Sequence, residues 1–404
     1  MNIFFLMDDE AGHIFPTFKM ADNFIDVGYT SIYITFEKQH QLIIDRGYKN
    51  LIIFPKADIK VELINDKKRS SNYNLSIIDG YLDYLMEEFN PCLIVSTLFL
   101  PWKAFLLSLK YEVPLFIVYS APELKILEKG PLNQFKDFLE EEFSNFSGLL
   151  PIRIYEFLKK ECPNFDQTKI DKCVNYYFLY HFPLDILLGN IIHDDRTFFI
   201  GPHIREERFE DKALTSILNR IKKQKIIYGS LGSQSNIYKE KSIKFYQLLI
   251  AMMQEKELLD YHLILSINSD FLQVLNVEEK SVHNITFMNW VSQLQVLKST
   301  KLFITHGGRG SLKEAINAEV PMLVFPMERD QYENSMLIRE KQLGDKMDVD
   351  NVDMKQLIHK VTSLVENTTI KNNLNRLNQL FVQQENLKIE VKLLNEIVYD
   401  SVFI

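Results

Sequence analysis

The sequence predicts an α/β protein built from two doubly wound parallel sheets, each in its own domain. The chain has 404 residues, and a single hydrophobic core rarely supports a chain of this length. Its short apolar runs are nearly continuous, which is typical of strands buried on both faces. Segments of helical period separate these runs, and this alternation favours βαβ units. The same rhythm occurs once in each half of the chain.

The first half is predicted to form one Rossmann-like domain over residues 1–205. Its candidate strands are residues 2–7, 31–36, 51–54, 92–97 and 114–119. Helical patterns lie between them, at 15–27 and 76–89. Residues 123–167 are irregular, aromatic and mixed in charge. This segment is too long for a plain connection, so we expect a helical excursion there.

The second half is predicted to form a domain over residues 206–380, followed by a C-terminal helix at 381–404. Its candidate strands are residues 225–230, 262–267, 284–288, 301–305 and 322–325. Helical patterns include 241–254 and 332–342. The domain boundary is indicated by Gly201-Pro202, which ends a strand before a strongly charged stretch. Two such sheets place ligand sites at the carboxyl ends of their strands.

Composition indicates which kinds of binding partner and which cellular location to expect. The net charge of −8 disfavours nucleic acid and anionic membranes as partners, but it is compatible with a small anionic ligand. The three cysteines form no CxxC pair, so we expect neither a disulfide framework nor a zinc site. The first residues lack a basic region, and no run reaches about 18 apolar residues. We therefore expect a cytoplasmic protein without a signal peptide or transmembrane segment, as a monomer or homodimer.

The stretch FITHGGRGSLKEAI, residues 303–316, joins a strand to a helix through His306 and three glycines. Glycine permits close backbone approach, and a helix N-terminus offers free N–H groups and the positive end of its dipole. These properties suit a phosphate. His306 could donate a hydrogen bond and, when protonated, a charge. Arg309 could add charge or point into solvent. The turn has neither the lysine of a P-loop nor GxGxxG spacing.

A second interpretation of this turn involves no ligand. Ser311 and Glu314 are three residues apart, which is the spacing of a capping box. The neighbouring strand ends favour the ligand. Trp290 follows the preceding strand, and Asp330 with Gln331 follows the next one. A stacking ring, a phosphate turn and a hydroxyl-binding pair at one sheet edge match the base, diphosphate and sugar of a nucleotide sugar. Trp290 could instead pack in the core.

These residues carry a family resemblance. Residues 290–334, with WVSQ, FITHGGRGSLKEA, VPM and DQ in order, resemble the donor-binding signature of glycosyltransferase family 1. This is the UDP-glycosyltransferase superfamily, and the HGG-x-G-S form is similar to its bacterial natural-product branch. GHIFPTFKMADNF (12–24) and IIYGSLGS (226–233) resemble two further family segments. The resemblance implies a GT-B fold, with the C-terminal helix crossing back to the first domain.

The resemblance also implies a donor, which is a nucleotide diphosphate sugar, with UDP-glucose as the first choice and TDP-sugars or UDP-N-acetylglucosamine open. No metal or other cofactor is implied. Trp290 would stack on the base, Gln293 would reach the base or ribose, and Glu314 would accept the ribose hydroxyls. Asn334 would contact the phosphate side or cap the helix beginning near Tyr332. The full set of implied donor-binding residues is Ser233, Trp290, Gln293, His306, Gly308, Arg309, Gly310, Ser311, Glu314, Asp330, Gln331 and Asn334.

His13 is the candidate general base, because it follows the first strand and a neutral imidazole suits this task near pH 7. The implied reaction is a one-step inverting transfer. Many family members have an aspartate at the end of the strand that here closes with Ser96 and Thr97. Three explanations are open. A hydroxyl of Ser96 or Thr97 orients His13, an acid among residues 8–10 (Asp8, Asp9, Glu10) substitutes, or the acceptor is acidic enough to need little help. We favour the first and third.

The acceptor is predicted to be a lipophilic or aromatic small molecule held by the first domain, with Phe15, Phe99 and Trp102 as candidate contacts. Three other functions use the same fold. A nucleotide-sugar epimerase would need no acceptor, a non-catalytic partner protein would have a degraded donor site, and a lipid-intermediate transferase would need a basic membrane-facing segment.

Overall fold

The computed structural model divides into two compact α/β units. It describes residues 1–8, 10–52, 81–97, 101–119, 176–180, 196–204, 210–232, 235–276, 283–328 and 330–400. The first unit comprises Met1–His203 together with Glu385–Ile404, and the second comprises Ile204–Gln384. The division lies two residues from the boundary expected after residue 205. The expected excursion at 123–167 lies outside the described residues.

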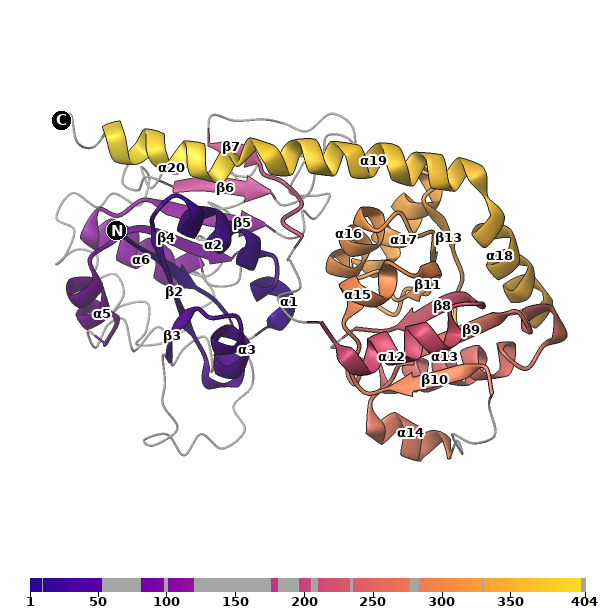
Figure 1. The fold of residues 1–404 in the computed structure, drawn as a ribbon. Coiled ribbons are helices and arrows are strands. Elements are labelled where there is room, and N and C mark those ends of the chain that lie inside the picture. The colour runs from indigo at the N-terminus through magenta and orange to yellow at the C-terminus, as the bar shows by residue number, and fades with distance from the viewer. Residues whose placement is uncertain are drawn as a thin grey trace. The chain divides into compact units, whose positions relative to one another are not determined.

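The first unit contains a seven-stranded sheet of order β3-β2-β1-β4-β5-β6-β7, in which all the pairs are parallel (Figure 1). Its strands are β1 (Asn2–Leu6), β2 (Thr30–Thr35), β3 (Lys49–Ile52), β4 (Pro91–Thr97), β5 (Leu115–Tyr119), β6 (Tyr176–Tyr180) and β7 (Thr197–Phe199). Each predicted run of this half overlaps a strand, although the run at 51–54 is described only at residues 51 and 52. The aromatic β6 was not predicted, because it follows the irregular segment that interrupts the rhythm.

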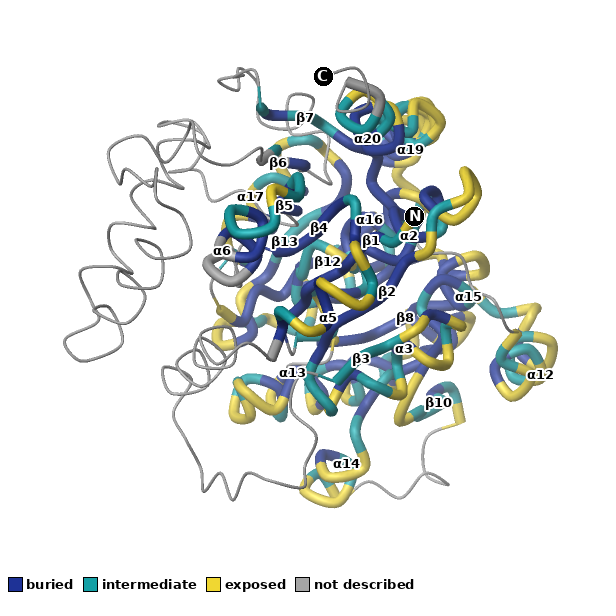
Figure 2. Tube along the Cα trace, turned by 90° about the vertical axis from the view of Figure 1, so that its left-hand side faces the viewer, coloured by how far each residue is buried: buried dark blue, intermediate teal, exposed yellow. Residues whose placement is uncertain are grey.

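The helices of this unit pack on the sheet through apolar faces. Those within the described residues are α1 (Ala11–Ile14), α2 (Thr17–Asp26), α3 (His40–Asp45), α5 (Tyr81–Phe89), α6 (Pro101–Tyr111) and α20 (Ile389–Asp400), with a short 3₁₀ turn at Glu37–Gln39. The central strands are buried, as Figure 2 shows. Helix α20 lies next to α2, and its Val391 and Leu394 join the core formed with Phe5 and Phe24. The end of the chain is therefore part of the first unit.

The second unit contains a six-stranded parallel sheet of order β10-β9-β8-β11-β12-β13. Its strands are β8 (Lys225–Ser230), β9 (Tyr261–Ser266), β10 (Ile285–Met288), β11 (Thr300–Thr305), β12 (Met322–Val324) and β13 (Gly344–Lys346). All the predicted runs form strands here too, so both sheets of the predicted fold class are confirmed. The sequence analysis missed β13, whose residues Gly-Asp-Lys form no apolar run. Its Gly344 permits close approach, since a Cβ there would lie 2.0 Å from the Met322 carbonyl oxygen.

Helices separate the strands of the second unit as expected. They are α12 (Lys212–Ile221), α13 (Lys239–Met252), α14 (Ser269–Leu275), α15 (Gln293–Leu297), α16 (Arg309–Asn317), α17 (Gln331–Glu340), α18 (Met354–Glu366) and α19 (Thr368–Leu387), with a 3₁₀ turn at Lys256–Leu258. None of the described helices has the length and apolar character that a membrane crossing requires.

Each sheet reverses its winding direction between two central strands. In the first unit β1 and β4 are neighbours, with Leu6 opposite Ser96. In the second unit β8 and β11 are neighbours, with Ser230 opposite Thr305. Connections leave such a pair toward opposite faces of the sheet and open a crevice at the carboxyl ends. The residues that follow these four strands are therefore the natural candidates for a site.

A buried polar cluster anchors α20 in the first unit. The Glu390 side chain is fully buried, Asn23 donates from Nδ2 to its Oε1 at 2.6 Å, and His203 Nε2 lies 3.3 Å from the same oxygen. The backbone N–H of His203 donates to Glu385 Oε2 at 2.9 Å. Burial alone would raise the pKa of Glu390, but the charge and hydrogen bond of His203 and the hydrogen bond of Asn23 outweigh it and lower this pKa. The carboxylate is thus ionised at neutral pH.

We expect Glu390→Ala to lower the free energy of unfolding by about 3–5 kcal/mol, because it leaves the His203 imidazole buried without its anion. Since the pKa of Glu390 is lowered on folding, its contribution is present above the ordinary value of 4.5 and is lost as the pH falls through the folded-state value. Denaturant unfolding followed by circular dichroism at pH 7 and pH 4 measures both effects.

Asp26→Ala is the matched control, because Asp26 forms an exposed ion pair of 3.2 Å with Lys388, just before α20. An exposed pair contributes about 1 kcal/mol or less. Equal losses in the two variants would contradict the role assigned to the buried cluster.

Candidate functional site

The turn after β11 presents the N-terminus of α16 at the crevice of the second sheet. Helix α16 begins at Arg309, and Gly308 is its N-cap, without a side-chain cap. Ser311 therefore lies inside the first turn, and the alternative interpretation of Ser311 and Glu314 as a capping box is wrong. The first intrahelical hydrogen bond runs from the Leu312 N–H to the Gly308 carbonyl at 3.1 Å. The preceding N–H groups of this turn have no acceptor within the helix, which is the property that suits an anion.

Two glycines make room for the His306 ring. A Cβ on Gly308 would lie 2.5 Å from His306 Nε2, and a Cβ on Gly232 would lie 2.9 Å from His306 Cε1. Gly232 also has a φ of +69°, which disfavours any other residue there. Each glycine leaves the space that the imidazole occupies. The ring is thus held between the loop after β8 and the start of α16.

His306 is a neutral hydrogen-bonding group in this site. Burial lowers its pKa to about 4, although the charge of Asp330 and a backbone hydrogen bond with Ser230 act in the opposite direction. The imidazole is therefore uncharged at pH 7. The positive charge that protonation of His306 would have added is absent at neutral pH, so any contribution to anion binding comes from a neutral N–H donor.

Three predicted nucleotide contacts lie together between α15 and α16. Gln293 donates from Nε2 to Glu314 Oε2 at 2.7 Å and to Ser311 Oγ at 3.2 Å. The hydroxyl of Tyr228 on β8 donates to Gln293 Oε1 at 3.5 Å. Burial, with a smaller contribution from the Glu314 charge, raises the pKa of Tyr228, so its hydroxyl stays protonated. The Gln293 amide is thus fixed by three groups from two elements, β8 and α16.

Trp290 is an exposed ring rather than a core residue. It lies two residues beyond the end of β10, and 64% of its surface is exposed. Core packing, the other interpretation of this tryptophan, is therefore excluded. A large apolar ring left in solvent at the carboxyl edge of the sheet is available for stacking on a flat ligand.

Arg309 and Asp330 form an ion pair near the start of α17. Arg309 Nε lies 3.6 Å from Asp330 Oδ2, and only 16% of the Arg309 side chain is exposed. Arg309 therefore does not extend into solvent. Asn334 donates from Nδ2 to Asp330 Oδ2 at 3.0 Å and to the Gly307 carbonyl at 2.9 Å. It ties α17 to the glycine turn, and the N-cap position of α17 is occupied by Asp330 instead.

Gln331, the second predicted sugar contact, supports its own loop. Its Oε1 accepts from the N–H groups of Met327 at 2.9 Å and Glu328 at 3.2 Å, and its Nε2 donates to the Tyr238 hydroxyl at 3.1 Å. The side chain is buried. The structure thus gives Gln331 a positioning role for the loop that precedes Asp330, in addition to any contact with a ligand.

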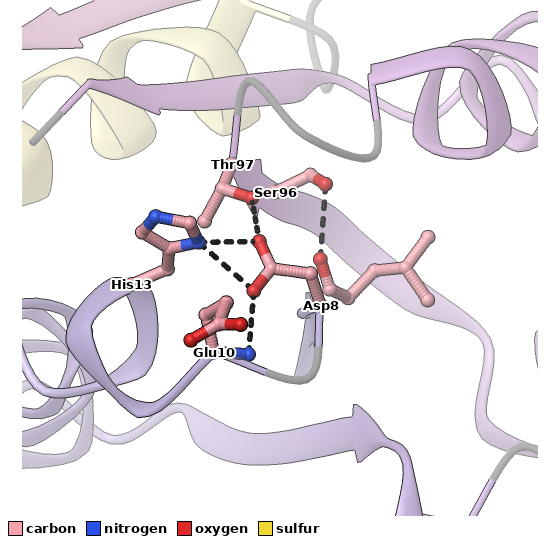
Figure 3. Close-up of polar contacts among 6 residues, drawn as sticks. Asp8, Glu10, His13, Ser96 and Thr97 are labelled. Atoms are coloured by element: carbon pink, nitrogen blue, oxygen red, sulfur yellow. Dashed lines mark hydrogen bonds and ion pairs between the residues drawn. The ribbon is translucent and has the colours of Figure 1, made fainter. Parts of the chain in front are cut away.

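The first unit holds a polar group at its own switch point. Helix α1 places the Nδ1 atom of His13 at 2.9 Å from both carboxylate oxygens of Asp8 (Figure 3). Asp8 is buried, with 7% of its surface exposed. Its Oδ1 accepts from the Glu10 N–H at 2.9 Å, and its Oδ2 accepts from the Thr97 hydroxyl at 2.8 Å. The Ser96 hydroxyl donates to the Leu6 carbonyl at 2.9 Å.

This geometry corrects one of the two favoured explanations for the missing aspartate, the one that used a hydroxyl. The hydroxyls of Ser96 and Thr97 were expected to orient His13, but they donate to Leu6 and to Asp8. Asp8, an alternative that we did not favour, contacts His13 directly. Pattern alone could not rank these groups. Asp8 precedes His13 by five residues in one loop, whereas Thr97 reaches Asp8 from 89 residues away only through the parallel register of β1 and β4.

The remaining predicted contacts are placed only in part. Phe15 packs edge-on against Phe18 with ring centroids 6.0 Å apart, and it borders the core of the first unit. Ser233, Phe99 and Asp9 lie outside the described residues, as does the side chain of Trp102. The part of the chain that the structure describes contains no group of three or more His, Cys, Asp or Glu residues that could hold a metal ion.

Two tyrosines that were not predicted from the sequence hold predicted site residues. Tyr228 and Tyr238 contact Gln293 and Gln331, respectively. Tyr228 lies inside the quoted IIYGSLGS segment, but as a strand residue it was indistinguishable from a core aromatic. Tyr238 has no pattern signal, because it immediately precedes α13 and reaches Gln331 only through the tertiary fold.

Comparison with known proteins finds similarity to glycosyltransferases. The family described as UDP-glucoronosyl and UDP-glucosyl transferase matches residues 216–390. NDP-glycosyltransferase YjiC of Bacillus subtilis (strain 168) is 25% identical over 344 residues, covering 82% of this chain and 81% of its own length. Solanidine UDP-glucose glucosyltransferase 1 of Solanum tuberosum is 22% identical over 423 residues, covering 87% of this chain and 83% of its own length.

Among solved structures, the spinosyn rhamnosyltransferase SpnG complexed with thymidine diphosphate is similar to this chain. The TM-score is 0.66 at 13% identity, covering 98% of this chain and 100% of that structure's chain. At this identity the likeness shows the fold, which agrees with the two parallel sheets described above.

We expect Gly308→Ala to displace the His306 ring and to lower the melting temperature of the protein, because the new methyl group would lie 2.5 Å from Nε2. Gly310→Ala is the matched control on the same helix turn. A Cβ at Gly310 meets nothing within 4 Å, so this change should stabilise α16 by about 0.4–1 kcal/mol. Differential scanning calorimetry measures both variants. A melting temperature for Gly308→Ala equal to or above that of Gly310→Ala would show that the ring does not need this space.

Proposed function

Since this chain belongs to the UDP-glycosyltransferase family and is a glycosyltransferase with the GT-B fold, we propose that it transfers glucose from UDP-glucose to a hydroxyl of a lipophilic or aromatic small molecule. The transfer inverts the anomeric carbon, and His13 is the general base. One relative, whose name includes both solanidine and UDP-glucose, supports this choice of donor and acceptor class.

The observation that carries the proposal is the convergence of base, ribose and diphosphate contacts at the switch point of the second sheet. Trp290 offers an exposed ring for the uracil base. Gln293 and Glu314, already joined by a hydrogen bond of 2.7 Å, bind the ribose edge. The N-terminus of α16 and His306 bind the diphosphate. A degraded donor site, as a non-catalytic partner protein would have, does not match this arrangement.

The same groups stabilise the leaving group. As the bond from the anomeric carbon to the diphosphate oxygen breaks, negative charge grows on UDP. The first-turn N–H groups of α16 point toward this charge, and the Arg309 guanidinium lies at the same turn. Preorganised donors of this kind lower the barrier because they need no rearrangement during the reaction. The neutral His306 contributes a hydrogen bond rather than a charge.

His13 removes the acceptor proton. Its Nδ1 faces Asp8, so when that nitrogen carries the ring hydrogen, the lone pair of the ring is on Nε2. Nε2 takes the hydroxyl proton while the acceptor oxygen attacks the anomeric carbon from the side opposite the diphosphate. One bond to the anomeric carbon forms, one breaks, and the configuration inverts. The proton ends on His13 and the charge on UDP.

We expect UDP and UDP-glucose to raise the melting temperature more than TDP, GDP or their sugars, because stabilisation grows with the ratio of ligand concentration to Kd.

Trp290→Ala should weaken UDP binding by about 10-fold or more, since stacking on a base contributes roughly 1–3 kcal/mol. Isothermal titration calorimetry measures the affinity. Tyr84→Ala is the control, because Tyr84 is as exposed as Trp290 but belongs to the first unit. The absence of a shift with any nucleotide would refute the proposed donor site.

We expect His13→Ala to lower kcat by about 10²–10⁴-fold, the range typical of general bases, while UDP binding stays unchanged. Chromatography of a panel of phenolic and alcoholic acceptors with UDP-glucose measures the product. Full turnover in His13→Ala would remove the base assignment, and glycosylation of only sugars or proteins in the panel would remove the acceptor class.

A further inference from the structure

We propose that Asp8 is the positioning residue for His13, and that Thr97 holds Asp8 in place from the neighbouring strand. The base-orienting carboxylate is thus supplied by the loop after β1, and the end of β4 supplies a hydroxyl donor to it. This inference rests on the proposed function for its catalytic meaning, but the geometry that carries it belongs to the first unit alone.

The Asp8 carboxylate is fixed by donors from three places. Thr97 donates its hydroxyl from β4, Glu10 donates its backbone N–H from the loop, and the imidazole of His13 approaches from α1. Both oxygens are used, since Oδ1 and Oδ2 each lie 2.9 Å from His13 Nδ1 (Figure 3). Asp8 is also buried. A carboxylate with this many donors has one orientation, so it can impose one orientation on the ring.

The contact also selects the ring tautomer. An ionised carboxylate only accepts hydrogen bonds, so its partner Nδ1 must carry a hydrogen. Neutral His13 is then protonated at Nδ1 and has its lone pair at Nε2. This is the arrangement that a base needs, because the wrong tautomer presents an N–H to the acceptor instead of a lone pair.

The register of the two strands explains why Thr97 is a threonine. Leu6 pairs with Ser96, so the residues that follow on each strand come together at the sheet edge. The Thr97 hydroxyl lies 2.8 Å from Asp8 Oδ2. A second carboxylate at this distance would repel the first and force one of them to take up a proton. The loop after β1 can therefore hold the Asp8 carboxylate only if the end of β4 offers a hydrogen-bond donor, which is the Thr97 hydroxyl.

The decisive experiment exchanges the two side chains. We expect Asp8→Asn to lower kcat by at least about tenfold, and by no more than His13→Ala does, because Asp8 acts through His13. KM for UDP-glucose should stay unchanged. The exchanged variant, Asp8→Thr with Thr97→Asp, should recover most of the activity that Asp8→Thr alone loses, since it returns a carboxylate to the same place from the other strand.

Asp26→Asn is the matched control, a carboxylate-to-amide change at an exposed ion pair with Lys388. It should leave kcat unchanged. Wild-type kcat in Asp8→Asn would overturn the inference, and so would an exchanged variant that folds, as judged by circular dichroism, yet is no more active than Asp8→Thr.

A second measurement does not depend on activity. Nitrogen-15 NMR of the imidazole distinguishes the two tautomers, and we expect hydrogen on Nδ1 of His13 in the wild type at a pH where the ring is neutral. Asp8→Ala should shift the population toward Nε2–H. A wild-type ring with its hydrogen on Nε2 would overturn the inference. If no acceptor is glycosylated by the wild type but the tautomer is as expected, the proposed function fails and the positioning role of Asp8 stands.

Discussion

The parallel pairing of strands at two switch points is the constraint on which the rest of this structure depends. Between β1 and β4, and again between β8 and β11, neighbouring strands end side by side while their connections leave in opposite directions. Residues far apart in sequence are thereby brought to one edge with their polar groups outside the buried sheet. Both candidate sites use this position, one for a base and one for an anion.

Each candidate site has a histidine at a sheet edge, but the surroundings of the two rings differ. His306 lies between Gly232 and Gly308, where burial lowers its pKa to about 4 and keeps it neutral. His13 is half-buried and has a carboxylate at Nδ1. The first ring is therefore a fixed neutral donor, and the second is a ring with one nitrogen committed to Asp8. The environment, not the residue type, separates their chemistry.

Polar groups in the second unit are connected to one another rather than left separate. Gln293 joins Ser311 to Glu314, and Asn334 joins Gly307 to Asp330. Such links position a site before a ligand arrives, which reduces the entropy that binding must overcome. In the first unit, the buried Glu390 fixes the terminal helix α20 through His203 and through the hydrogen bond that Asn23 donates.

The sequence alone determined the two sheets, nearly all their strands and the turn FITHGGRGS, because apolar runs and glycine positions are local signals. It could not place β13, whose Gly-Asp-Lys pairs by backbone alone, or show that Trp290 is exposed. It also ranked Ser96 and Thr97 above Asp8 as partners of His13. Only the tertiary structure decided that question. The register of β1 against β4, which no local pattern encodes, brings the Thr97 hydroxyl to Asp8, and the imidazole contacts the Asp8 carboxylate from the same loop.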